Sequence, residues 1–349
     1  RACAARRWPC RRAPGACGCG TQRSRACEHE SMSLAEFALI DRLRARAAQR
    51  DDVVLGIGDD AALLALPAGE QLVVTADTLN SGVHFPAETA AADIGWKALA
   101  VNLSDLAAMG AVPAWCTVSL SMPEADARWV DAFLDGFDAL ARMHAVALVG
   151  GDTTRGPLSI CVTVHGFVAP GRALQRGAAC AGDDIWVSGT PGDAAGALRQ
   201  WRGGGAIDPD LRARLDRPSP RLALGDALLG IAHAAIDVSD GLLADLGHIA
   251  RASGLAAVIE LDDVPASPAL RAAFDADVRH QLQATGGDDY ELCFTAPPAL
   301  ADVVRQAARN AGTPVARIGR MGEGAGVSAR LAGAPWAPSG LGWDHFAVP

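Results

Sequence analysis

The sequence predicts two domains of the α/β (α+β) class. The chain has 349 residues, 50% of them hydrophobic, which is enough to bury a large core and more than one average domain needs. Between residues 71 and 168, apolar strand-like runs alternate with segments of helical period, and a second such series begins near residue 183. This alternation is typical of strands that pack against helices.

Residues 32–170 form the predicted N-terminal domain. Ser33 and Glu36 make a capping box at the start of a first helix. The strand-like runs that follow are QLVVTAD (71–77), AWCTVSLSM (114–122) and LSICVTVHGFV (158–168), with helical patterns at roughly 88–109 and 124–143 between them.

Residues 171–349 form the predicted C-terminal α/β domain. The boundary is expected in the Gly- and Ala-rich stretch 169–183. Apolar runs separated by Gly, Pro and Asp predict a second set of strands. These runs lie near 183–189, 234–238, 256–261, 291–296 and 314–319.

Residues 1–31 differ from the rest of the chain, and we interpret them as a disordered or artefactual extension ahead of a start at Met32. They contain seven Arg, two Glu and five of the nine Cys, without an apolar segment of the kind a signal peptide has. Without this extension, whose net charge is +5, the −9 of the whole chain becomes −14. So acidic a body disfavours a nucleic-acid partner and favours metal cations, and its apolar runs are too short for a membrane span. We expect a cytoplasmic protein.

Acidic residues recur beside small residues at predicted strand ends, loops and helix flanks. The motifs are GIGDDAAL (Asp59, Asp60), TADT (Asp77), NLSDLAAMG (Asp105), GGDTTRG (Asp152), DVSDGL (Asp237, Asp240) and TGGDDYEL (Asp288, Asp289). Single Asp residues are common in turns and caps, but Asp105 lies in an otherwise apolar helix, where a buried acid has to be paired or metal-bound. Two carboxylates about 4 Å apart repel by roughly 4 kcal/mol at an effective dielectric near 20. Converging carboxylates therefore predict Mg²⁺, which binds carboxylates, water and phosphate oxygens.

Basic residues limit how a nucleotide can be bound. The chain contains one lysine, Lys97, which follows neither a P-loop nor the Gly-rich loop of protein kinases. Nucleotide phosphates must then be bound by Mg²⁺, arginine and backbone N–H groups. Arg155 and Arg176 are candidates, and the pair Gly150 and Gly151 exposes backbone donors ahead of Asp152.

Several long motifs together resemble the thiamine-monophosphate kinase family, within the aminoimidazole-ribonucleotide-synthetase-like superfamily. They are GIGDDAALL, TADTL followed by HF, KALAVNLSDLAAMGA, GGDTTRGPLS, IDVSDGLLADLGHI, GDDYELCF and WDHF, in the family's order from about Ser33 onward. The resemblance implies a two-domain PurM-like fold whose N-terminal domain binds ATP and Mg²⁺ and dimerises through its sheet. It also implies ATP-dependent phosphorylation of thiamine monophosphate to thiamine diphosphate, the final step of thiamine diphosphate biosynthesis, by a homodimer.

The resemblance also implies residue roles. It implies that Mg²⁺ is bound by Asp60, Thr75, Asp77, Asp105, Asp152 and Asp237, with Asp240 a further contact. Gly151, Asp152, Arg176 and Ser239 would bind the nucleotide, and His84, Asp288 and Trp343 would face the substrate. The chain departs from the family twice: Asp288 stands where Glu is common, and Ala76 lacks a hydroxyl, so that any metal bond there would come from its backbone carbonyl.

The chemistry implied needs no acid or base residue. A phosphate oxygen with a second pKa of about 6 is already ionised near neutral pH, so we expect direct in-line transfer without a phosphoenzyme. His84 would position the acceptor, and Trp343 would stack on one of its rings. Their alternatives are a structural histidine and an aromatic anchor for the C-terminal tail.

Three other interpretations are weaker. Selenophosphate synthetases and purine-pathway synthetases would share the acidic motifs of this chain. A selenophosphate synthetase would also have a Lys in an N-terminal Gly-rich segment, and this chain has no such Lys. A hydrogenase-maturation relative would end in a reactive Cys, whereas this sequence ends in HFAVP. A non-enzymatic cation-binding protein would be expected to carry a calcium loop of the DxDxDG type, and none occurs.

Overall fold

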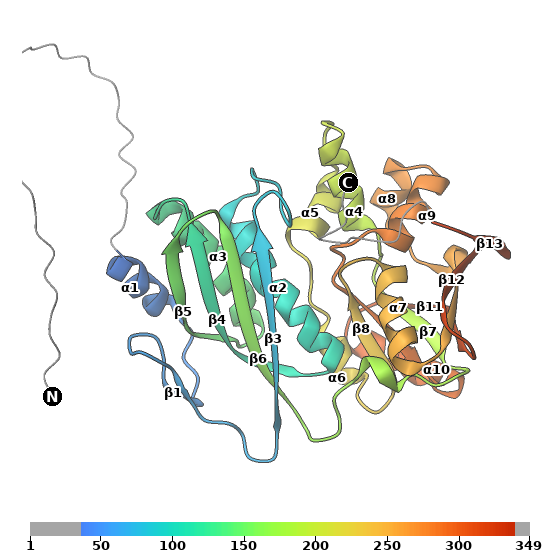
Figure 1. Cartoon of the computed structure of the whole chain (residues 1–349), viewed down its shortest axis with the longest axis horizontal. Helices are drawn as coiled ribbons and strands as arrows, with labels where there is room; N and C mark the ends of the chain where they lie inside the picture. Colours follow the sequence, from blue (N-terminus) through green and yellow to red (C-terminus); the bar gives the residue numbers. More distant parts are fainter. Residues whose placement is uncertain (1–35, 339–349) are drawn as a thin grey trace, which may run out of the picture. The chain divides into compact units, whose positions relative to one another are not determined.

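A computed structural model describes residues 36–338, which are built around two separate β-sheets (Figure 1). One sheet has four strands in the order β3-β6-β4-β5, and the other has seven in the order β13-β12-β9-β11-β7-β10-β8. A small hairpin of β1 (Val53–Leu55) and β2 (Leu63–Leu64) accompanies the first sheet. Helices pack against both sheets, which confirms the predicted α/β class.

The four-stranded sheet contains the three predicted strands and one that was not predicted. Its strands are β3 (Gln71–Asn80), β4 (Val112–Met122), β5 (Ala147–Arg155) and β6 (Ser159–Val168). Asp152 was expected at a strand end or in a loop, and this was wrong, because it lies inside β5, paired with Ser119 of β4. The Gly-Gly pair that suggested a loop permits close pairing instead: a Cβ at Gly151 would lie 1.9 Å from the Val118 carbonyl oxygen.

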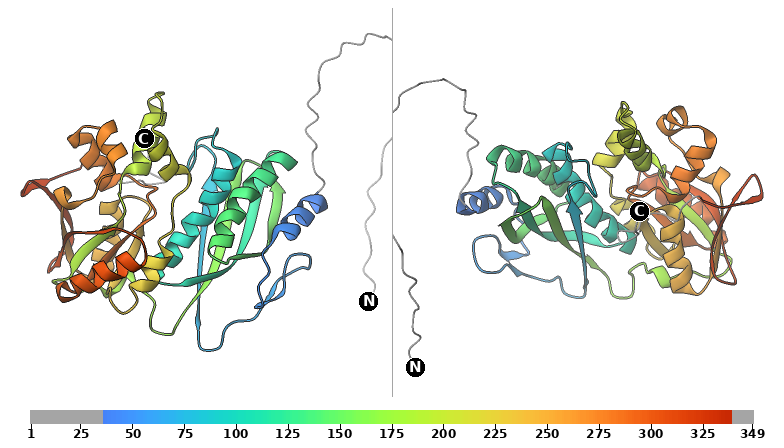
Figure 2. Two further views of the ribbon diagram at one scale, coloured as in Figure 1. Left: turned by 180° about the vertical axis from the view of Figure 1, so that it is seen from behind. Right: turned by 45° about the horizontal axis from the view of Figure 1, so that its top comes forward.

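Two helices cover one face of this sheet, α2 (Ala91–Met109) and α3 (Ala127–Met143), as Figure 2 shows from behind. They cross closely because both carry glycine at the contact: a Cβ at Gly136 would lie 1.7 Å from the Ala92 carbonyl oxygen. Helix α1 (Glu36–Arg46) joins α3 through an Arg46–Asp138 ion pair of 2.8 Å. Both helices predicted between the strands are therefore confirmed.

The seven-stranded sheet contains the five predicted strands of the second series. Its strands are β7 (Asp184–Ser188), β8 (Ala234–Val238), β9 (Ala256–Glu260), β10 (Glu291–Ala296), β11 (Val315–Gly322), β12 (Gly326–Leu331) and β13 (Ala334–Trp336). Strands β7, β8 and β10 are buried on both faces. One face packs on α7 (Leu242–Ser253), and the other on α6 (Leu222–Ala227) and α10 (Ala301–Asn310).

Four short helices form a smaller apolar cluster beside this sheet: α4 (Asp193–Arg202), α5 (Pro209–Asp216), α8 (Pro268–Ala273) and α9 (Ala276–Thr285). Three 3₁₀ turns complete the described elements: η1 (Arg176–Ala178), η2 (Leu261–Asp263) and η3 (Pro298–Leu300). Within residues 36–338, none of the helices combines the length and apolar character that a membrane crossing needs.

Helix α2 is the element that positions the site. It contacts β3 and β6 of the first sheet and β8 and β10 of the second, so it is buried around most of its circumference. A helix in that position is expected to be apolar on all sides. Its few polar residues, which include Lys97, Asn102, Ser104 and Asp105, therefore stand out at the junction of the two sheets.

Candidate functional site

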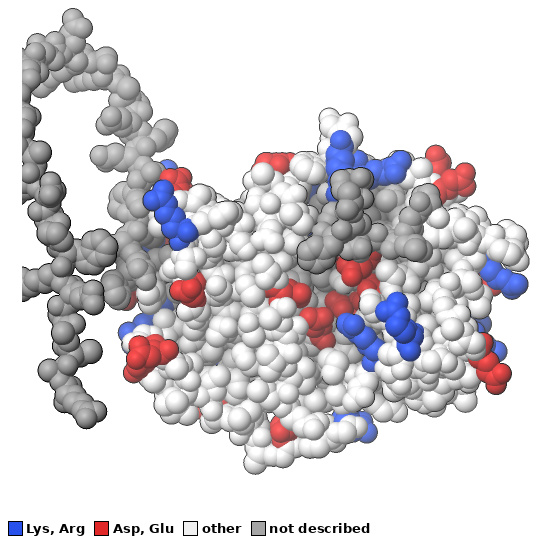
Figure 3. All heavy atoms as spheres, in the orientation of Figure 1, with Lys and Arg blue, Asp and Glu red and all other residues white. Residues whose placement is uncertain are grey.

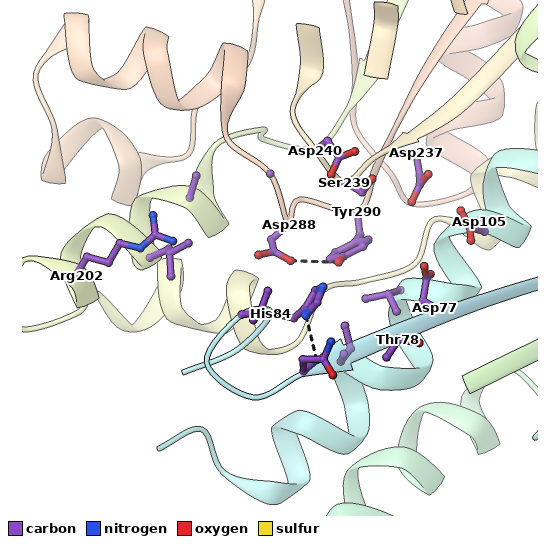
Figure 4. A pocket seen from close by; sticks show the side chains of 17 residues that line it. Asp77, Thr78, His84, Asp105, Arg202, Asp237, Ser239, Asp240, Asp288 and Tyr290 are labelled. Atoms are coloured by element: carbon purple, nitrogen blue, oxygen red, sulfur yellow. Dashed lines mark hydrogen bonds between the residues drawn. The ribbon is translucent and has the colours of Figure 1, made fainter. Parts of the chain in front are cut away.

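A cavity of about 700 Å³ lies where the first sheet, α2 and the second sheet meet. Figure 3 shows acidic side chains gathered in a hollow of this part of the surface, with basic side chains nearby. Residues on β3 and α2 line one side, and the turns after β8 and before β10 line the other (Figure 4). The predicted site residues in its lining are Asp77, His84, Asp105, Asp237, Ser239, Asp240 and Asp288.

Strand β3 and helix α2 are held together by polar contacts at this cavity. Thr75 Oγ1 donates a hydrogen bond to Asp105 Oδ2, and the Asp77 N–H donates to Asn102 Oδ1 at 3.0 Å. Strand alternation places Thr75 and Asp77 on the face toward α2, and Ala76 on the opposite face. The first contact fixes the Asp105 carboxylate, and the second fixes the backbone of Asp77 on the strand beside it.

A third carboxylate enters the same cavity from the second sheet. Asp237 lies near the end of β8 with 5% of its surface exposed. Its Oδ2 accepts a hydrogen bond of 2.8 Å from Ser104 Oγ of α2. Neighbouring positions of α2 therefore bind acids from both sheets, and this explains why Ser104 and Asp105 interrupt its apolar sequence.

The electrostatics of these three acids favour a bound cation. Burial, together with repulsion from Asp105 and Asp240, raises the pKa of Asp77 to about 6. Burial also raises the pKa of Asp105, and it raises the pKa of Asp237 well above its usual range, with repulsion from Asp105 as the next cause. The donors are oxygen atoms only, so this group suits a hard divalent cation such as Mg²⁺.

The turn after β8 is shaped by an acid that the sequence interpretation did not single out. Asp245 Oδ2 accepts hydrogen bonds from the N–H groups of Ser239, Asp240 and Gly241, at 3.0, 3.0 and 3.1 Å. Burial and the nearby Asp240 raise the pKa of Asp245 to about 7. Asp245 thus fixes the backbone that presents Ser239 and Asp240 to the cavity.

The predicted substrate-facing residues within the described range both line the cavity and come from different sheets, His84 from the turn after β3 and Asp288 from the turn before β10 (Figure 4). Asp288 has a left-handed backbone (φ +68°), its N–H donates to the Ser239 carbonyl at 2.8 Å, and Tyr290 Oη donates to its Oδ1 at 3.1 Å. His84 accepts a hydrogen bond of 3.0 Å from the Asn80 N–H at Nδ1. Trp343 lies outside the described residues.

Arg202 and Tyr290 are among the lining residues that sequence reasoning missed. Tyr290 is the one tyrosine of the chain and directly follows the GDD motif, a signal that was available. Arg202 ends α4 and gives no comparable signal in the sequence. Arg176, which was predicted, lies in η1, and its charge partly offsets the rise that burial causes in the pKa of Asp105.

A second cavity of about 710 Å³ is lined by three other predicted ligands, Asp60, Gly151 and Asp152, whereas Thr75, Ala76 and Arg176 line neither cavity. It lies between α1, the loop at 56–62 and strands β4 and β5, and both acids are exposed. The resemblance implied that Asp60 binds Mg²⁺ together with Asp77 and Asp105. Within one copy of the chain, Asp60 lines one cavity, whereas Asp77 and Asp105 line the other.

The sheet register explains this separation. Asp152 is aligned with Ser119, which is aligned with Cys161 and, through it, with Thr78, so these side chains share one face of the sheet. Asp77, one residue before Thr78, points to the other face. Asp152 and Asp77 therefore lie on opposite faces.

Among residues 36–338, one group of three possible metal ligands has its donor atoms within 4.8 Å of one another, formed by Cys180, Asp183 and His233, whereas Asp77, Asp105 and Asp237 are spaced more widely. The Asp183 carboxylate already accepts hydrogen bonds of 2.8 Å from the Cys180 N–H and 2.8 Å from His233 Nδ1. Because these contacts satisfy the buried carboxylate, we assign the group to the fold.

Comparison with known proteins agrees with this architecture. Residues 58–168 match the N-terminal domain, and residues 181–332 the C-terminal domain, of the AIR synthase related protein family. The fold and its acidic cavity thus define a member of that class.

Comparison with individual relatives specifies the family within this class. Thiamine-monophosphate kinase of Salmonella typhimurium is 45% identical over 331 residues, covering 91% of this chain and 100% of its own length. The crystal structure of the thiamine-monophosphate kinase from Stenotrophomonas maltophilia K279a has a TM-score of 0.80 and 60% identity over 87% of this chain and 98% of its own. The structure of AaThiL complexed with AMPPCP and TMP has a TM-score of 0.71 and 30% identity over 93% of this chain and 100% of its own. The chain belongs to the thiamine-monophosphate kinase family.

Proposed function

We propose that this chain catalyses the ATP- and Mg²⁺-dependent phosphorylation of thiamine monophosphate to thiamine diphosphate, the final step of thiamine diphosphate biosynthesis. The observation that carries the proposal is the meeting of Asp77, Asp105 and Asp237 in one cavity, in a chain of this family. A substrate with several phosphates binds together with Mg²⁺, and carboxylates gathered in one cavity would hold that Mg²⁺.

Asp77, Asp105 and Asp237 would hold Mg²⁺, with Asp240 beside them and Thr75 and the Ala76 carbonyl as additional oxygen donors. When bound, Mg²⁺ would neutralise charge on the phosphate oxygens. The protein contributes positions: β3 and α2 fix two of the acids, and Ser104 fixes the third. These contacts limit the reorganisation needed when phosphates enter.

The reaction forms a bond between the γ-phosphorus of ATP and a phosphate oxygen of thiamine monophosphate. The bond from that phosphorus to the bridging oxygen of ADP breaks, and ADP leaves with the electron pair. Because the attacking oxygen is ionised near neutral pH, no side chain has to remove a proton. The task of the protein is to bring the two phosphates into line.

Residues around the acids would bind the two substrates. Gly151, Asp152, Arg176 and Ser239 are proposed to contact ATP, and His84 and Asp288 the acceptor, together with Trp343. His84 and Asp288 both line the first cavity, one after β3 and the other before β10, which supports an acceptor that contacts both. Arg202 in the same lining adds a guanidinium suited to phosphate.

We further propose that the chain acts as a homodimer formed through its four-stranded sheet. The face of this sheet opposite α2 carries exposed apolar side chains, including Leu72 (43% exposed) and Val74 (53% exposed). Asp152 lies on that same face, in a different cavity from Asp77. A second copy that brings its own Asp60 and Asp152 to the first cavity would unite the predicted ligands in one site.

The domain division and location belong to the same proposal. Residues 32–170 would be the ATP- and Mg²⁺-binding, dimerising domain, and residues 171–349 the C-terminal α/β domain. The four described cysteines, Cys116, Cys161, Cys180 and Cys293, are free thiols, which is typical of proteins in a reducing cytoplasm.

The test is a chromatographic assay of the purified chain with ATP, Mg²⁺ and thiamine monophosphate. Free thiamine as acceptor and a reaction with EDTA are the controls. We expect thiamine diphosphate from the monophosphate alone, and only with the metal. Absence of product while ATP still binds would redirect the assignment to another acceptor within the same class of proteins.

A further inference from the structure

Lys97, the one lysine of the chain, lies within α2 with 2% of its side chain exposed. A buried ammonium group is unfavourable unless it is paired and hydrogen-bonded. Lys97 Nζ lies 3.0 Å from Asp288 Oδ1 and donates a hydrogen bond of 2.9 Å to the His84 carbonyl oxygen. The two contacts therefore go to the two described residues that are proposed to face the acceptor.

These partners come from different parts of the fold. His84 follows β3 of the four-stranded sheet, and Asp288 precedes β10 of the seven-stranded sheet. Helix α2 lies between the sheets, so the Lys97 ammonium connects both sides of the cavity without belonging to its lining.

Asp288 also needs support from its surroundings. Its backbone adopts φ +68°, a left-handed conformation that is uncommon for residues other than glycine. Its carboxylate Oδ1 is fixed from two directions, by Lys97 Nζ at 3.0 Å and by Tyr290 Oη at 3.1 Å. A short aspartate, in place of the glutamate expected at this position, is thereby held in a defined orientation toward the cavity.

We propose that Lys97 is a positioning residue for the phosphate acceptor. It fixes the Asp288 carboxylate by charge and the backbone of His84 by a hydrogen bond, and so sets the relative position of the two residues that are proposed to contact the acceptor. This inference rests on the proposed function. It assigns Lys97 no contact with ATP, so its loss should affect the two substrates differently.

A purely structural lysine predicts a different outcome. Loss of a buried ion pair within a core helix would lower the folding stability and the amount of active enzyme, and it would leave the KM values of both substrates unchanged. A positioning lysine raises the KM for the acceptor selectively. The ratio of the two KM values therefore distinguishes the roles.

The experiment compares Lys97→Met and Lys97→Gln with the wild type. Arg46→Met is the matched control, because it breaks the Arg46–Asp138 ion pair between α1 and α3, whose Asp138 side chain is 8% exposed. For each protein the KM for thiamine monophosphate, the KM for ATP and the thermal midpoint are measured, and thiamine monophosphate binding is measured by equilibrium dialysis without ATP.

We expect both Lys97 variants to raise the KM and the dissociation constant for thiamine monophosphate by about tenfold to a hundredfold, because a misplaced binding group costs that much. The KM for ATP should stay within about twofold, and Arg46→Met should leave the KM for thiamine monophosphate unchanged, since the interaction that it removes lies outside the first cavity. Combining Lys97→Met with Asp288→Asn should add little to either single change, because both remove one shared interaction.

Each contrary outcome overturns the inference. An unchanged acceptor KM in folded Lys97 variants, or effects of Lys97→Met and Asp288→Asn that multiply, would show that Lys97 does not act through Asp288. Failure of both Lys97 variants to fold would assign the residue to folding alone. Failure of the proposed function is separate, because the wild type itself would then make no thiamine diphosphate.

Discussion

The two cavities contain acids of opposite character. The buried carboxylates, as we call the buried Asp237 and the half-buried Asp77 and Asp105, lie between the sheets, and burial raises the pKa of all three. The exposed carboxylates, Asp60 and Asp152, lie along α1, β4 and β5 and remain in contact with solvent. Acids that repel one another out of water need a counter-ion, whereas acids in water do not.

This difference indicates which part of the site one copy of the chain can form alone. The buried carboxylates are held by contacts from Thr75 and Ser104, so their arrangement exists before any ligand binds. The exposed carboxylates line the second cavity together with Asp41 and Asp59, and within residues 36–338 no hydrogen bond holds the side chain of Asp60 or Asp152. We interpret them as ligands that complete a site only when a second copy is present.

The largest effect is expected from removing a buried carboxylate. Asp237→Asn should lower kcat by at least about a hundredfold at saturating Mg²⁺, because the substitution removes one carboxylate ligand from the proposed metal site. In EDTA the same change should raise the thermal midpoint, because it removes a charge that Asp105 repels. Steady-state kinetics and thermal melts measure the two effects.

Asp183→Asn is the control for this prediction. Asp183 is also buried, but its carboxylate is paired with His233 outside the cavity. It should destabilise the fold and leave the Mg²⁺ dependence of turnover unchanged. If Asp237→Asn kept wild-type turnover, the buried carboxylates would not form the metal site.

The sequence predicted this comparison only in part. Every acid of both groups was identified, because Asp beside small residues at element ends is visible in the sequence. Their division into two cavities was not, because it depends on β5, whose Gly-Gly-Asp-Thr-Thr composition resembles a loop. One strand assigned correctly would have placed Asp152 on the face opposite Asp77.

Lys97 shows a second limit. The sequence excluded it as a P-loop lysine, and that was all the sequence could do. Its role depends on the distance from α2 to the turn before β10, a contact between residues 191 positions apart (288 minus 97) that no local pattern encodes. The strands and main helices were predictable because their periodicity is local.

A smaller effect is expected from the exposed carboxylates, and it tests whether they act on a second copy. Asp152→Asn alone should lower kcat by about tenfold to a hundredfold. Mixing Asp152→Asn subunits with Asp77→Asn subunits should restore activity to about a quarter of wild type, because half the dimers are mixed and each has one intact site.

The mixture is made by joint refolding or co-expression, and its rate is compared with that of each variant alone. Activity that stays at the level of the single variants would place Asp152 and Asp77 in the site of one copy. It would also remove the argument for a shared site.

A smaller change in activity is expected from a charge on the exposed apolar face of the four-stranded sheet, and it tests the proposed dimer. Val74→Arg puts a charge on the face proposed for dimerisation, where Val74 is 53% exposed. We expect a shift toward monomer in analytical ultracentrifugation and a turnover rate that falls on dilution, because the site is then completed less often. Val303→Arg, on α10 at 45% exposure, is the matched control and should change neither. A Val74→Arg protein that remained dimeric would exclude this face.

The smallest effect concerns stability against pH without metal. Since the pKa of Asp77 is raised to about 6 in the folded protein, this state binds more protons than the unfolded chain between roughly pH 4 and 6, so stability falls as pH rises through that window. In EDTA, Asp77→Asn should therefore gain about 2 to 6 °C in thermal midpoint over wild type as pH increases from 4 to 7.

The control is a carboxylate whose effect on stability has the opposite sign. Arg50 lowers the pKa of Asp52, so Asp52→Asn should lose stability relative to wild type as pH rises. Excess Mg²⁺ should abolish the advantage of Asp77→Asn at pH 7, since the cation then stabilises the ionised carboxylates. An advantage that persisted in Mg²⁺ would mean that the buried carboxylates repel one another without binding the metal.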